Sequence, residues 1–299
     1  MPKLEWFAAL AAVAEHGGFT PAARALHISQ PALHAQVRKL GDALGVTLYV
    51  RRGRGLSLTR EGERAVVFAR DLQRRTRALM AELGGAADTE PVVLAAGEGA
   101  MLYLIDEAIG AFARRGSSPL SLLTRDRDGT IEALRSAEAH VGVVAGEAPG
   151  QLRAEVIDDV PHRLAMPSRH PWAERARIPL ARLGETPLVV APPGGALRRR
   201  LQMELTRIGA SLDIGVEARG WELTLHFVGL GLGLAVVNGC CRLPRGIVAR
   251  PIQGLPSVRY WLLSRPELSA HTGTQVLLDC IRARRRTWRS RARSAVRSA

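Results

Sequence analysis

The chain has 299 residues, which is more than one hydrophobic core usually organises, so its length predicts two domains. Hydrophobic residues make up 46% of the sequence, and this excludes a largely disordered chain. A formal net charge of +14 indicates an anionic partner, with nucleic acid as the first candidate. Arginines concentrated between residues 282 and 297 supply part of that excess, so the charge alone does not establish nucleic-acid binding.

The cysteines and the start of the chain bear on its compartment. Cys240, Cys241 and Cys280 have the spacing of neither a disulfide framework nor a zinc site, which favours a reducing compartment. The first residues lack the charged and then apolar regions of a secretory signal. The most apolar stretch, residues 223–241, is interrupted by polar residues and glycines, as is typical of a core segment. We expect a soluble cytoplasmic protein with no metal, no cofactor and no membrane contact.

The first sixty residues predict a helix-turn-helix. Apolar residues at helical spacing predict a first helix that ends at two glycines. Thr20 is a good N-cap and Pro21 suits a first turn, so a short second helix is expected over residues 22–26. Ser29 is expected to cap a longer third helix over residues 30–44. Two short helices, a tight turn and a longer polar-faced helix are typical of a helix-turn-helix.

A wing and a long helix follow. Residues 48–52 and 56–58 predict two short strands around a tip rich in glycine and arginine. Such a basic wing contacts phosphate or the minor groove while the recognition helix enters the major groove. Thr59 is expected to cap a helix over residues 60–83, whose apolar residues approximate a heptad suited to pairing with a second copy. A run of glycine and alanine at 84–87 marks the domain boundary.

Beyond the boundary, strands alternate with helices, which predicts parallel α/β sheets. The expected strands cover residues 92–96, 120–124, 141–145, 163–166, 188–191 and 234–237. The expected helices cover residues 100–115, 130–136, 196–208 and 221–228.

Four stretches carry a family resemblance: GGFTPAARAL (17–26), ISQPAL (28–33), LGVTLYVR (44–51) and LTREG (58–62). Together they resemble the DNA-binding segment of LysR-type transcriptional regulators. The rest of the chain resembles the family's effector domain more loosely, through HPWA (170–173) and GLGLG (229–233).

The resemblance implies an α/β fold class with a winged helix-turn-helix and a long linker helix before a two-lobed, periplasmic-binding-protein-like effector domain. The implied divisions are a DNA-binding domain over 1–59, a linker and dimerisation helix with hinge over 60–90, and an effector domain over 91–299. Within the last, lobe I is expected at about 91–161 and 267–290, and lobe II at about 162–266.

Five positions depart from residues usual in the family. His34 replaces a serine, Ala35 an arginine, Gly41 an acidic residue, His140 an aspartate and Asn238 a proline. These departures concern base preference and the fine shape of the cleft, because none of them disturbs the pattern that defines the fold.

The base-reading residues are expected on the first turns of the third helix. Gln30 can bond adenine bidentately, and His34 can donate to guanine or a phosphate. Ala32 can contact a thymine methyl group. Arginines around this helix and on the wing are expected to contact phosphate, and a plain solvated surface is the alternative for each. The predicted DNA-binding set is Thr20, Ser29, Gln30, Pro31, Ala32, His34, Arg38, Arg51, Arg52 and Arg54.

By resemblance, a small-molecule effector binds between the lobes, where helix N-termini favour anions. The implied lining is Glu98, Gly99, Ala100, Arg127, Thr130, Gly194, Gly195, Leu197, Trp221 and Thr224. Family members often have serine or threonine where Glu98 stands. An unpaired carboxylate there would repel an acid, so Glu98 either pairs with an arginine or indicates a ligand with an amine or several hydroxyls.

Two other motifs have weaker functional interpretations. The GLGLG run at 229–233 precedes a strand, whereas a dinucleotide fingerprint lies between a strand and a helix. Adjacent Cys240 and Cys241 fit a redox sensor, but buried structural cysteines are commoner.

The sequence therefore predicts a homo-oligomeric regulator and not an enzyme. We expect a dimer or tetramer on an imperfect palindrome of double-stranded DNA, a small-molecule effector, and contact with RNA polymerase if the protein activates. It would be nucleoid-associated in the cytoplasm. One alternative is a regulator without an effector, or a nonspecific DNA binder. Another is an enzyme or solute-binding protein that uses the α/β region, against which the lack of a catalytic constellation counts.

Overall fold

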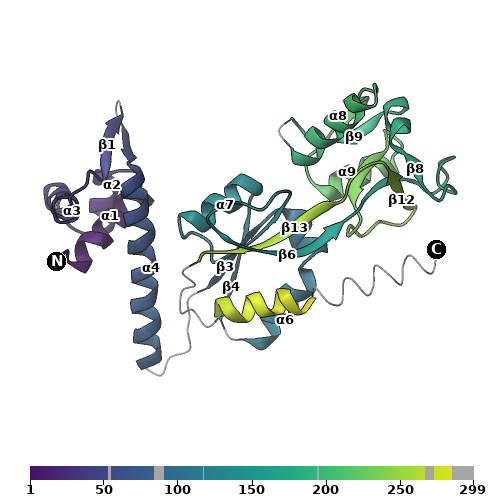
Figure 1. Ribbon diagram of the computed structural model, residues 1–299. Helices are drawn as coiled ribbons and strands as arrows, with labels where there is room; N and C mark the ends of the chain where they lie inside the picture. Colours follow the sequence, from purple (N-terminus) through teal and green to yellow (C-terminus); the bar gives the residue numbers. More distant parts are fainter. Residues whose placement is uncertain (53–54, 84–90, 117, 194, 267–272, 285–299) are drawn as a thin grey trace.

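The structure is a computed structural model that describes residues 1–52, 55–83, 91–116, 118–193, 195–266 and 273–284. A small helical domain, a long helix and a two-lobed α/β domain follow one another along the chain (Figure 1).

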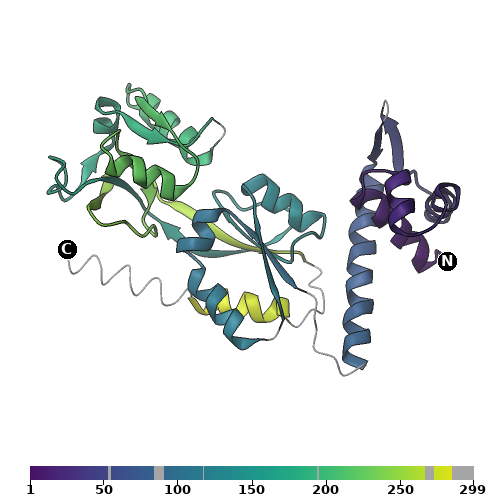
Figure 2. The same ribbon diagram turned by 180° about the vertical axis from the view of Figure 1, so that it is seen from behind.

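The N-terminal domain is a winged helix-turn-helix. Three fully buried leucines, Leu10, Leu33 and Leu40, lie in its single core, which α1 and α3 share. Its two wing strands pair antiparallel, and the helix that follows packs its first half against α1, as the view from behind shows (Figure 2). Its elements are α1 (Leu4–Glu15), α2 (Phe19–Ala25), α3 (Gln30–Leu44), β1 (Tyr49–Arg52), β2 (Gly55–Leu58) and α4 (Arg60–Leu83).

Two predicted helix caps are confirmed. Ser29 Oγ accepts a hydrogen bond from the backbone N–H of Ala32 at 3.3 Å. Thr59 Oγ1 accepts from the backbone N–H of Gly62 at 3.0 Å. A Cβ atom at Gly62 would lie 1.8 Å from the carbonyl oxygen of Leu48, so only glycine fits where the wing meets α4.

The predicted cap of the second helix is wrong. Helix α2 begins at Phe19, so Thr20 lies inside its first turn and Gly18 occupies the cap position. The Thr20 hydroxyl instead donates to the side-chain oxygen of Gln30 at 3.1 Å. Thr20 therefore joins α2 to the start of α3 through a hydrogen bond between side chains.

Lobe I is built on a five-stranded sheet with strand order β4-β3-β5-β13-β6. Strands β4, β3 and β5 are parallel, and β13 is antiparallel to both of its neighbours. Helices α5, α6 and α7 and a helix over residues 273–284 complete it. The elements are β3 (Val92–Ala96), α5 (Glu98–Tyr103), α6 (Asp106–Arg115), β4 (Leu120–Thr124), α7 (Arg127–Arg135), β5 (Val141–Ala145), β6 (Arg153–Val160) and β13 (Val258–Ser264).

Lobe II contains a four-stranded sheet with strand order β11-β7-β12-β8 and a separate parallel pair, β10-β9. Its core is rich in leucine and valine, and α9 packs on β7 and β11. The elements are β7 (His162–Pro167), β8 (Ile178–Pro179), a 3-10 helix (Leu180–Glu185), β9 (Leu188–Val190), α8 (Ala196–Arg207), β10 (Ile214–Glu217), α9 (Trp221–Gly229), β11 (Ala235–Asn238) and β12 (Ile247–Gln253).

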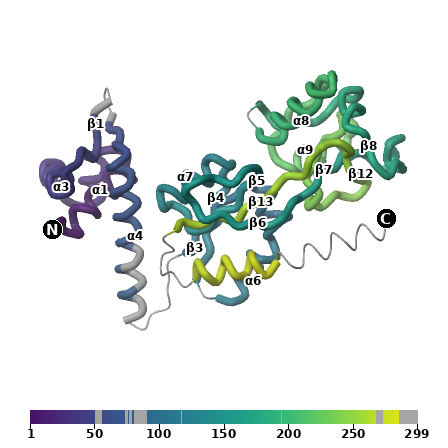
Figure 3. The backbone as a smooth tube through the Cα atoms, in the orientation of Figure 1, coloured from purple at the N-terminus to yellow at the C-terminus, as the bar shows by residue number. Residues whose placement is uncertain are grey.

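The chain crosses between the lobes twice, along neighbouring strands. Strand β6 continues through Pro161 into β7, and β12 leads back to β13. Because β6 and β13 pair along their whole lengths, the two crossings lie side by side (Figure 3). Such paired crossings allow the lobes to tilt about a short segment while each keeps its own core.

The structure differs from the sequence prediction of this domain in several respects, and strands β8, β10, β12 and β13 were not predicted. The helix expected over 100–115 is two helices, because the chain leaves helical geometry at Ile105, whose φ is −121°. The sheets are mixed and not purely parallel. The expected lobe II, residues 162–266, contains β13, which lies in the sheet of lobe I, so the lobes divide between β12 and β13.

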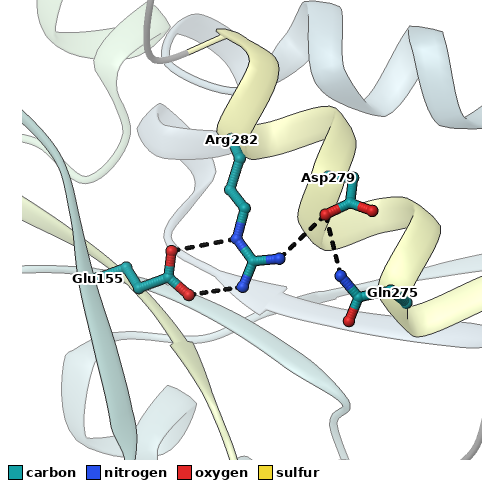
Figure 4. A network of polar contacts seen from close by, with 4 residues as sticks. All are labelled: Glu155, Gln275, Asp279 and Arg282. Atoms are coloured by element: carbon teal, nitrogen blue, oxygen red, sulfur yellow. Dashed lines mark hydrogen bonds and ion pairs between the residues drawn. The ribbon is translucent and has the colours of Figure 1, made fainter.

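Strand β6 escaped prediction because it carries acidic residues where apolar alternation would be expected. Glu155 accepts two hydrogen bonds from Arg282, at 3.1 and 2.6 Å, and so ties β6 to the helix over 273–284 (Figure 4). Asp279 accepts from both Arg282 and Gln275, at 3.0 and 2.9 Å. Arg282 therefore belongs to the folded lobe I, although the sequence grouped it with the arginine-rich C-terminal segment.

No helix within the described residues is long and apolar enough to span a membrane. The same residues hold no group of three or more histidine, cysteine or acidic side chains placed to bind a metal ion.

Candidate functional site

The first turn of α3 is exposed to solvent, and a hydrogen bond holds one of its side chains in place. Gln30, Pro31 and Ala32 are all exposed in its first turn. Since the side-chain oxygen of Gln30 accepts from Thr20, the amide NH₂ group of Gln30 remains to donate outward. The arrangement orients one amide at the end of the helix that a helix-turn-helix inserts into the major groove.

His34 lies one turn further along α3 and joins it to the wing. Its Nε2 atom shares a 2.8 Å hydrogen bond with the hydroxyl of Tyr49 on β1. The ring of Phe19 lies 5.0 Å from that of His34 and 5.2 Å from that of Tyr49, centroid to centroid. His34 is half-buried in this cluster, so part of its hydrogen-bonding capacity is used inside the protein. Sequence reasoning did not single out Phe19 and Tyr49. Aromatic residues form only 4% of the chain, so two of them close to the recognition helix were a signal that could have been used.

The basic residues around this edge are only partly described. Arg38 is exposed on the second half of α3, and Arg24 and Lys39, which sequence reasoning did not single out, are also exposed nearby. Arg51 and Arg52 lie in β1, but their side chains, like the whole of residue Arg54, lie outside the described part of the chain. Gly41, a departure from the family pattern, has a close neighbour: a Cβ atom there would lie 2.9 Å from the carbonyl oxygen of Val46.

Three of the predicted effector residues meet where the lobes touch. A Cβ atom at Gly99 would lie 2.2 Å from Nε1 of Trp221, so α5 of lobe I and α9 of lobe II approach closely at this glycine. Glu98 is exposed beside it, with a carboxylate oxygen 3.5 Å from where a Cβ of Gly220 would lie. Within the described residues Glu98 makes no ion pair, so the arginine partner considered for it is absent there. Ala100 is buried in the core of lobe I.

The other predicted effector residues mostly serve the fold. Arg127 donates to the backbone carbonyls of Ala145 and Glu147, at 3.1 and 2.8 Å. The Thr224 hydroxyl donates to the carbonyl of Gly220 at 2.8 Å. Thr130 is completely buried, and its hydroxyl has no partner among the described residues. Gly195 caps α8, Leu197 packs against the core of lobe II, and Gly194 lies outside the described residues.

Two further residues that depart from the family pattern, His140 and Asn238, have structural roles. His140 Nδ1 accepts from the backbone N–H of Val93 at 2.8 Å, so it holds β3 against the start of β5. Asn238 donates from Nδ2 to the hydroxyl of Tyr260 at 2.5 Å, which links β11 of lobe II to the crossing strand β13.

The adjacent cysteines are buried beside that link. Cys240 is buried in a core cluster with residues of lobe I, and Cys241 is half-buried. The hydrogen bond from Cys241 lowers the pKa of Cys240, while the same contact, together with burial, raises the pKa of Cys241. The burial of Cys240 favours the structural interpretation over the redox one.

A contact between α4 and lobe I connects the N-terminal winged helix-turn-helix domain (the reader domain) to the effector domain. Arg70 donates to the backbone carbonyl of Ser136 at 2.6 Å. Asp71 forms an ion pair with Arg265 at 3.3 Å, and their side chains are only 16% and 8% exposed. Ser136 caps the C-terminal end of α7, whose first residue is Arg127 of the predicted cleft. Helix α7 therefore runs from Arg127 to the contact with the linker helix.

These features define a class of protein: a DNA-binding transcriptional regulator with a ligand-sensing α/β domain. Residues 4–63 match the bacterial regulatory helix-turn-helix protein, lysR family, and residues 85–286 match the LysR substrate binding domain. The chain belongs to the LysR family of transcriptional regulators, and it is not an enzyme.

Named relatives agree with this assignment. The DNA-binding transcriptional dual regulator OxyR of Escherichia coli (strain K12) is 29% identical over 284 residues, 92% of this chain and 93% of its own length. The RuBisCO operon transcriptional regulator of Allochromatium vinosum is 29% identical over 262 residues, 84% of this chain and 86% of its own. A full-length OxyR variant from Pseudomonas aeruginosa superposes with a TM-score of 0.71 at 25% identity, covering 94% of this chain and 98% of that one.

Proposed function

We propose that the chain reads an imperfect palindrome in double-stranded DNA through two copies of its recognition helix. The observation that carries this proposal is the orientation of Gln30 by Thr20 at an exposed, capped helix start. The Gln30 side-chain oxygen keeps a second lone pair, so an amide held in this way can still bond adenine bidentately, whereas arginines on the wing and on α3 position the domain on phosphates. Two-fold symmetry of the protein would impose the dyad on the operator.

An exposed apolar surface on α4 supports the pairing of two copies of the chain. A groove of about 430 Å³ runs between α1 and α4 and is lined by Leu4, Phe7, Ala69 and Leu72. Phe68, Leu79 and Met80 are exposed apolar side chains on the same long helix. A second copy packing along α4 would cover these residues, as in a heptad-paired dimer. A tetramer would then form from two such dimers.

The effector domain would control the reader through the contact between α4 and lobe I. We place a small-molecule effector at the junction of Glu98, Gly99 and Trp221, where the lobes meet. A ligand that changes the lobe angle there would act on Ser136 through α7 and so on Arg70. Differential binding to two lobe arrangements is what such control requires. An activator of this kind would also contact RNA polymerase, on the nucleoid in the cytoplasm.

A mobility-shift titration over a range of salt concentrations tests the proposal, with DNA from the gene's own upstream region and random DNA. We expect Gln30→Ala to lose the preference for upstream DNA and to keep the wild-type salt slope, because the amide contacts bases and not phosphates. Gln202→Ala, an exposed glutamine on α8, is the matched control. Equal binding of both DNAs by the wild type would instead indicate a nonspecific DNA binder.

A second candidate function, a regulator without an effector, is supported by a separate observation. The polar groups of Arg127 and Thr224, which the resemblance assigns to the cleft, are hydrogen-bonded to backbone carbonyls. Thermal-shift titration with a panel of small metabolites decides between the two: a ligand of the folded protein raises its melting temperature by mass action. A response lost on Trp221→Ala would favour the regulator with an effector.

A further inference from the structure

A cavity of about 780 Å³ lies on the other side of α9 from the predicted cleft lining. It is open to solvent and is lined by the loop after β7, by one side of α9 and by the loop between β11 and β12, with Tyr103 of lobe I at one edge. None of the ten residues that the resemblance assigns to the effector lines this cavity. Its volume falls within the range of pockets that hold small organic molecules.

The lining of the cavity carries more basic than acidic residues. Arg169, Arg242 and Arg245 line it, and Glu222 is the one acidic residue among the described residues of the lining. Arg242 is already paired with Asp106 of lobe I, so Arg169 and Arg245 carry the excess positive charge. Arg169 and Arg245 make no ion pair with any residue that the structure describes. Arginine side chains without a counter-ion can bind carboxylate or phosphate groups through paired N–H donors.

Arg242 has a second role, because it links the lobes. It donates to the carboxylate of Asp106 at 2.5 Å, and Asp106 begins α6 of lobe I. Arg242 itself lies in the loop between β11 and β12 of lobe II. The same guanidinium can therefore serve either the interlobe ion pair or an anion in the cavity.

Donors and acceptors for neutral groups complete the wall. The Tyr103 hydroxyl is a hydrogen-bond donor, and burial raises the pKa of this phenol, so it stays protonated. Glu222 makes no ion pair with any described residue, and it can accept from a ligand hydroxyl. Leu225 and Ile247 provide apolar contact for a short carbon skeleton.

We propose that this cavity is a second ligand site, separate from the lobe cleft, for a small organic dianion that also carries a hydroxyl group. Its two negative charges, on two carboxylates or on one phosphate group, bind Arg169 and Arg245, and its hydroxyl donates to Glu222. A bound anion competes with Asp106 for Arg242 and so weakens an ion pair that holds the lobes together. Binding at this site would thereby change the angle between the lobes independently of a ligand in the lobe cleft.

Isothermal titration calorimetry of the full chain, without DNA, tests the proposal with three probes: malate, succinate and glycerol 2-phosphate. We expect one malate or glycerol 2-phosphate per chain, and the tighter of the two identifies the anion class. Arg169→Ala/Arg245→Ala should bind at least tenfold more weakly. Arg175→Ala/Arg177→Ala, which removes two exposed arginines of the same lobe, should bind like the wild type.

Glu222→Gln is expected to strengthen the binding of a dianion, whereas the Arg169→Ala/Arg245→Ala variant is expected to weaken it. It removes the one carboxylate that the described residues contribute to the wall, so succinate should bind several-fold more tightly, and the preference for malate over succinate should shrink. The proposal is overturned if the wild type binds none of the probes, if both arginine pairs weaken binding equally, or if Glu222→Gln leaves succinate binding unchanged. Because no DNA is present, none of these outcomes bears on the proposed operator binding.

Discussion

His34 of the recognition helix and Tyr49 of the wing are joined by a 2.8 Å hydrogen bond between Nε2 and the phenolic hydroxyl. The two residues stand 15 positions apart, and Phe19 packs against both rings. The contact fixes the angle between the helix that reads bases and the strand that leads to the wing. In such a domain the two elements must reach adjacent grooves at the same time.

Loss of that hydrogen bond should weaken operator binding more than it weakens the fold. For Tyr49→Phe we expect about a fivefold loss of affinity for operator DNA, since a net hydrogen bond contributes ~1 kcal/mol. The aromatic packing on Phe19 stays, so the melting temperature should change little. Titrations of Tyr49→Phe, His34→Ala and the double variant form a cycle. Additive losses would show that the two residues do not act together.

The contact between α4 and lobe I should hold the reader close to the effector domain. We expect Arg70→Ala/Asp71→Asn to increase the radius of gyration measured by small-angle X-ray scattering. The reason is that the double variant removes both the Ser136 hydrogen bond and the buried partner of Arg265. Glu61→Ala/Arg64→Ala, at exposed positions on the same helix, should leave the radius of gyration unchanged. An unchanged radius in both variants would mean that other contacts position α4.

Contacts between distant residues also mark the limit of what the sequence predicts. The caps at Ser29 and Thr59 and the recognition helix are set by residues a few positions apart, and they were predicted correctly. The bond from Arg70 to Ser136 joins residues 66 positions apart, and the pair Glu155–Arg282 joins residues 127 apart. No local pattern encodes such pairs, because each depends on how whole elements pack.

The predicted effector residues illustrate the same limit. Resemblance located Glu98, Gly99 and Trp221, which do meet at the lobe junction. It also assigned Arg127 and Thr224 to the cleft, although their side chains bond backbone carbonyls. A residue type at a motif position predicts where the backbone goes, but the partners of its side chain depend on the neighbouring elements.

Gly62 should tolerate no side chain. Gly62→Ala places a methyl group where it would lie 1.8 Å from the carbonyl oxygen of Leu48, so the wing or α4 must shift. We expect a loss of at least ~2 kcal/mol in the free energy of unfolding of the N-terminal domain, as for overpacked cores. Differential scanning calorimetry of the full chain measures it. Gly150→Ala is the control, because nothing lies within 4 Å of a Cβ at that glycine. An equal effect of both substitutions would contradict the steric explanation.

His162 should make lobe II sensitive to acid. Burial, reinforced by the nearby Arg200 guanidinium, lowers the pKa of this histidine to about 4 from 6.5. As pH falls below about 6.5, His162 becomes protonated in the unfolded chain but stays neutral in the folded chain. The free energy of unfolding therefore decreases until the pH reaches about 4. At ~1.4 kcal/mol per pKa unit, the full loss is about 3 kcal/mol. Well above pH 6.5 both states are neutral at this residue, and it makes no contribution to the pH dependence.

The matching experiment compares slopes, since a substitution at a buried position also changes baseline stability. We expect the melting temperature of the wild type to fall more steeply between pH 6.5 and 4 than that of His162→Leu, which cannot take up the proton. His16→Leu, at an exposed residue after α1, should retain the wild-type slope. If His162→Leu and the wild type lose stability in parallel, other groups carry the acid sensitivity, and the buried histidine is not its source.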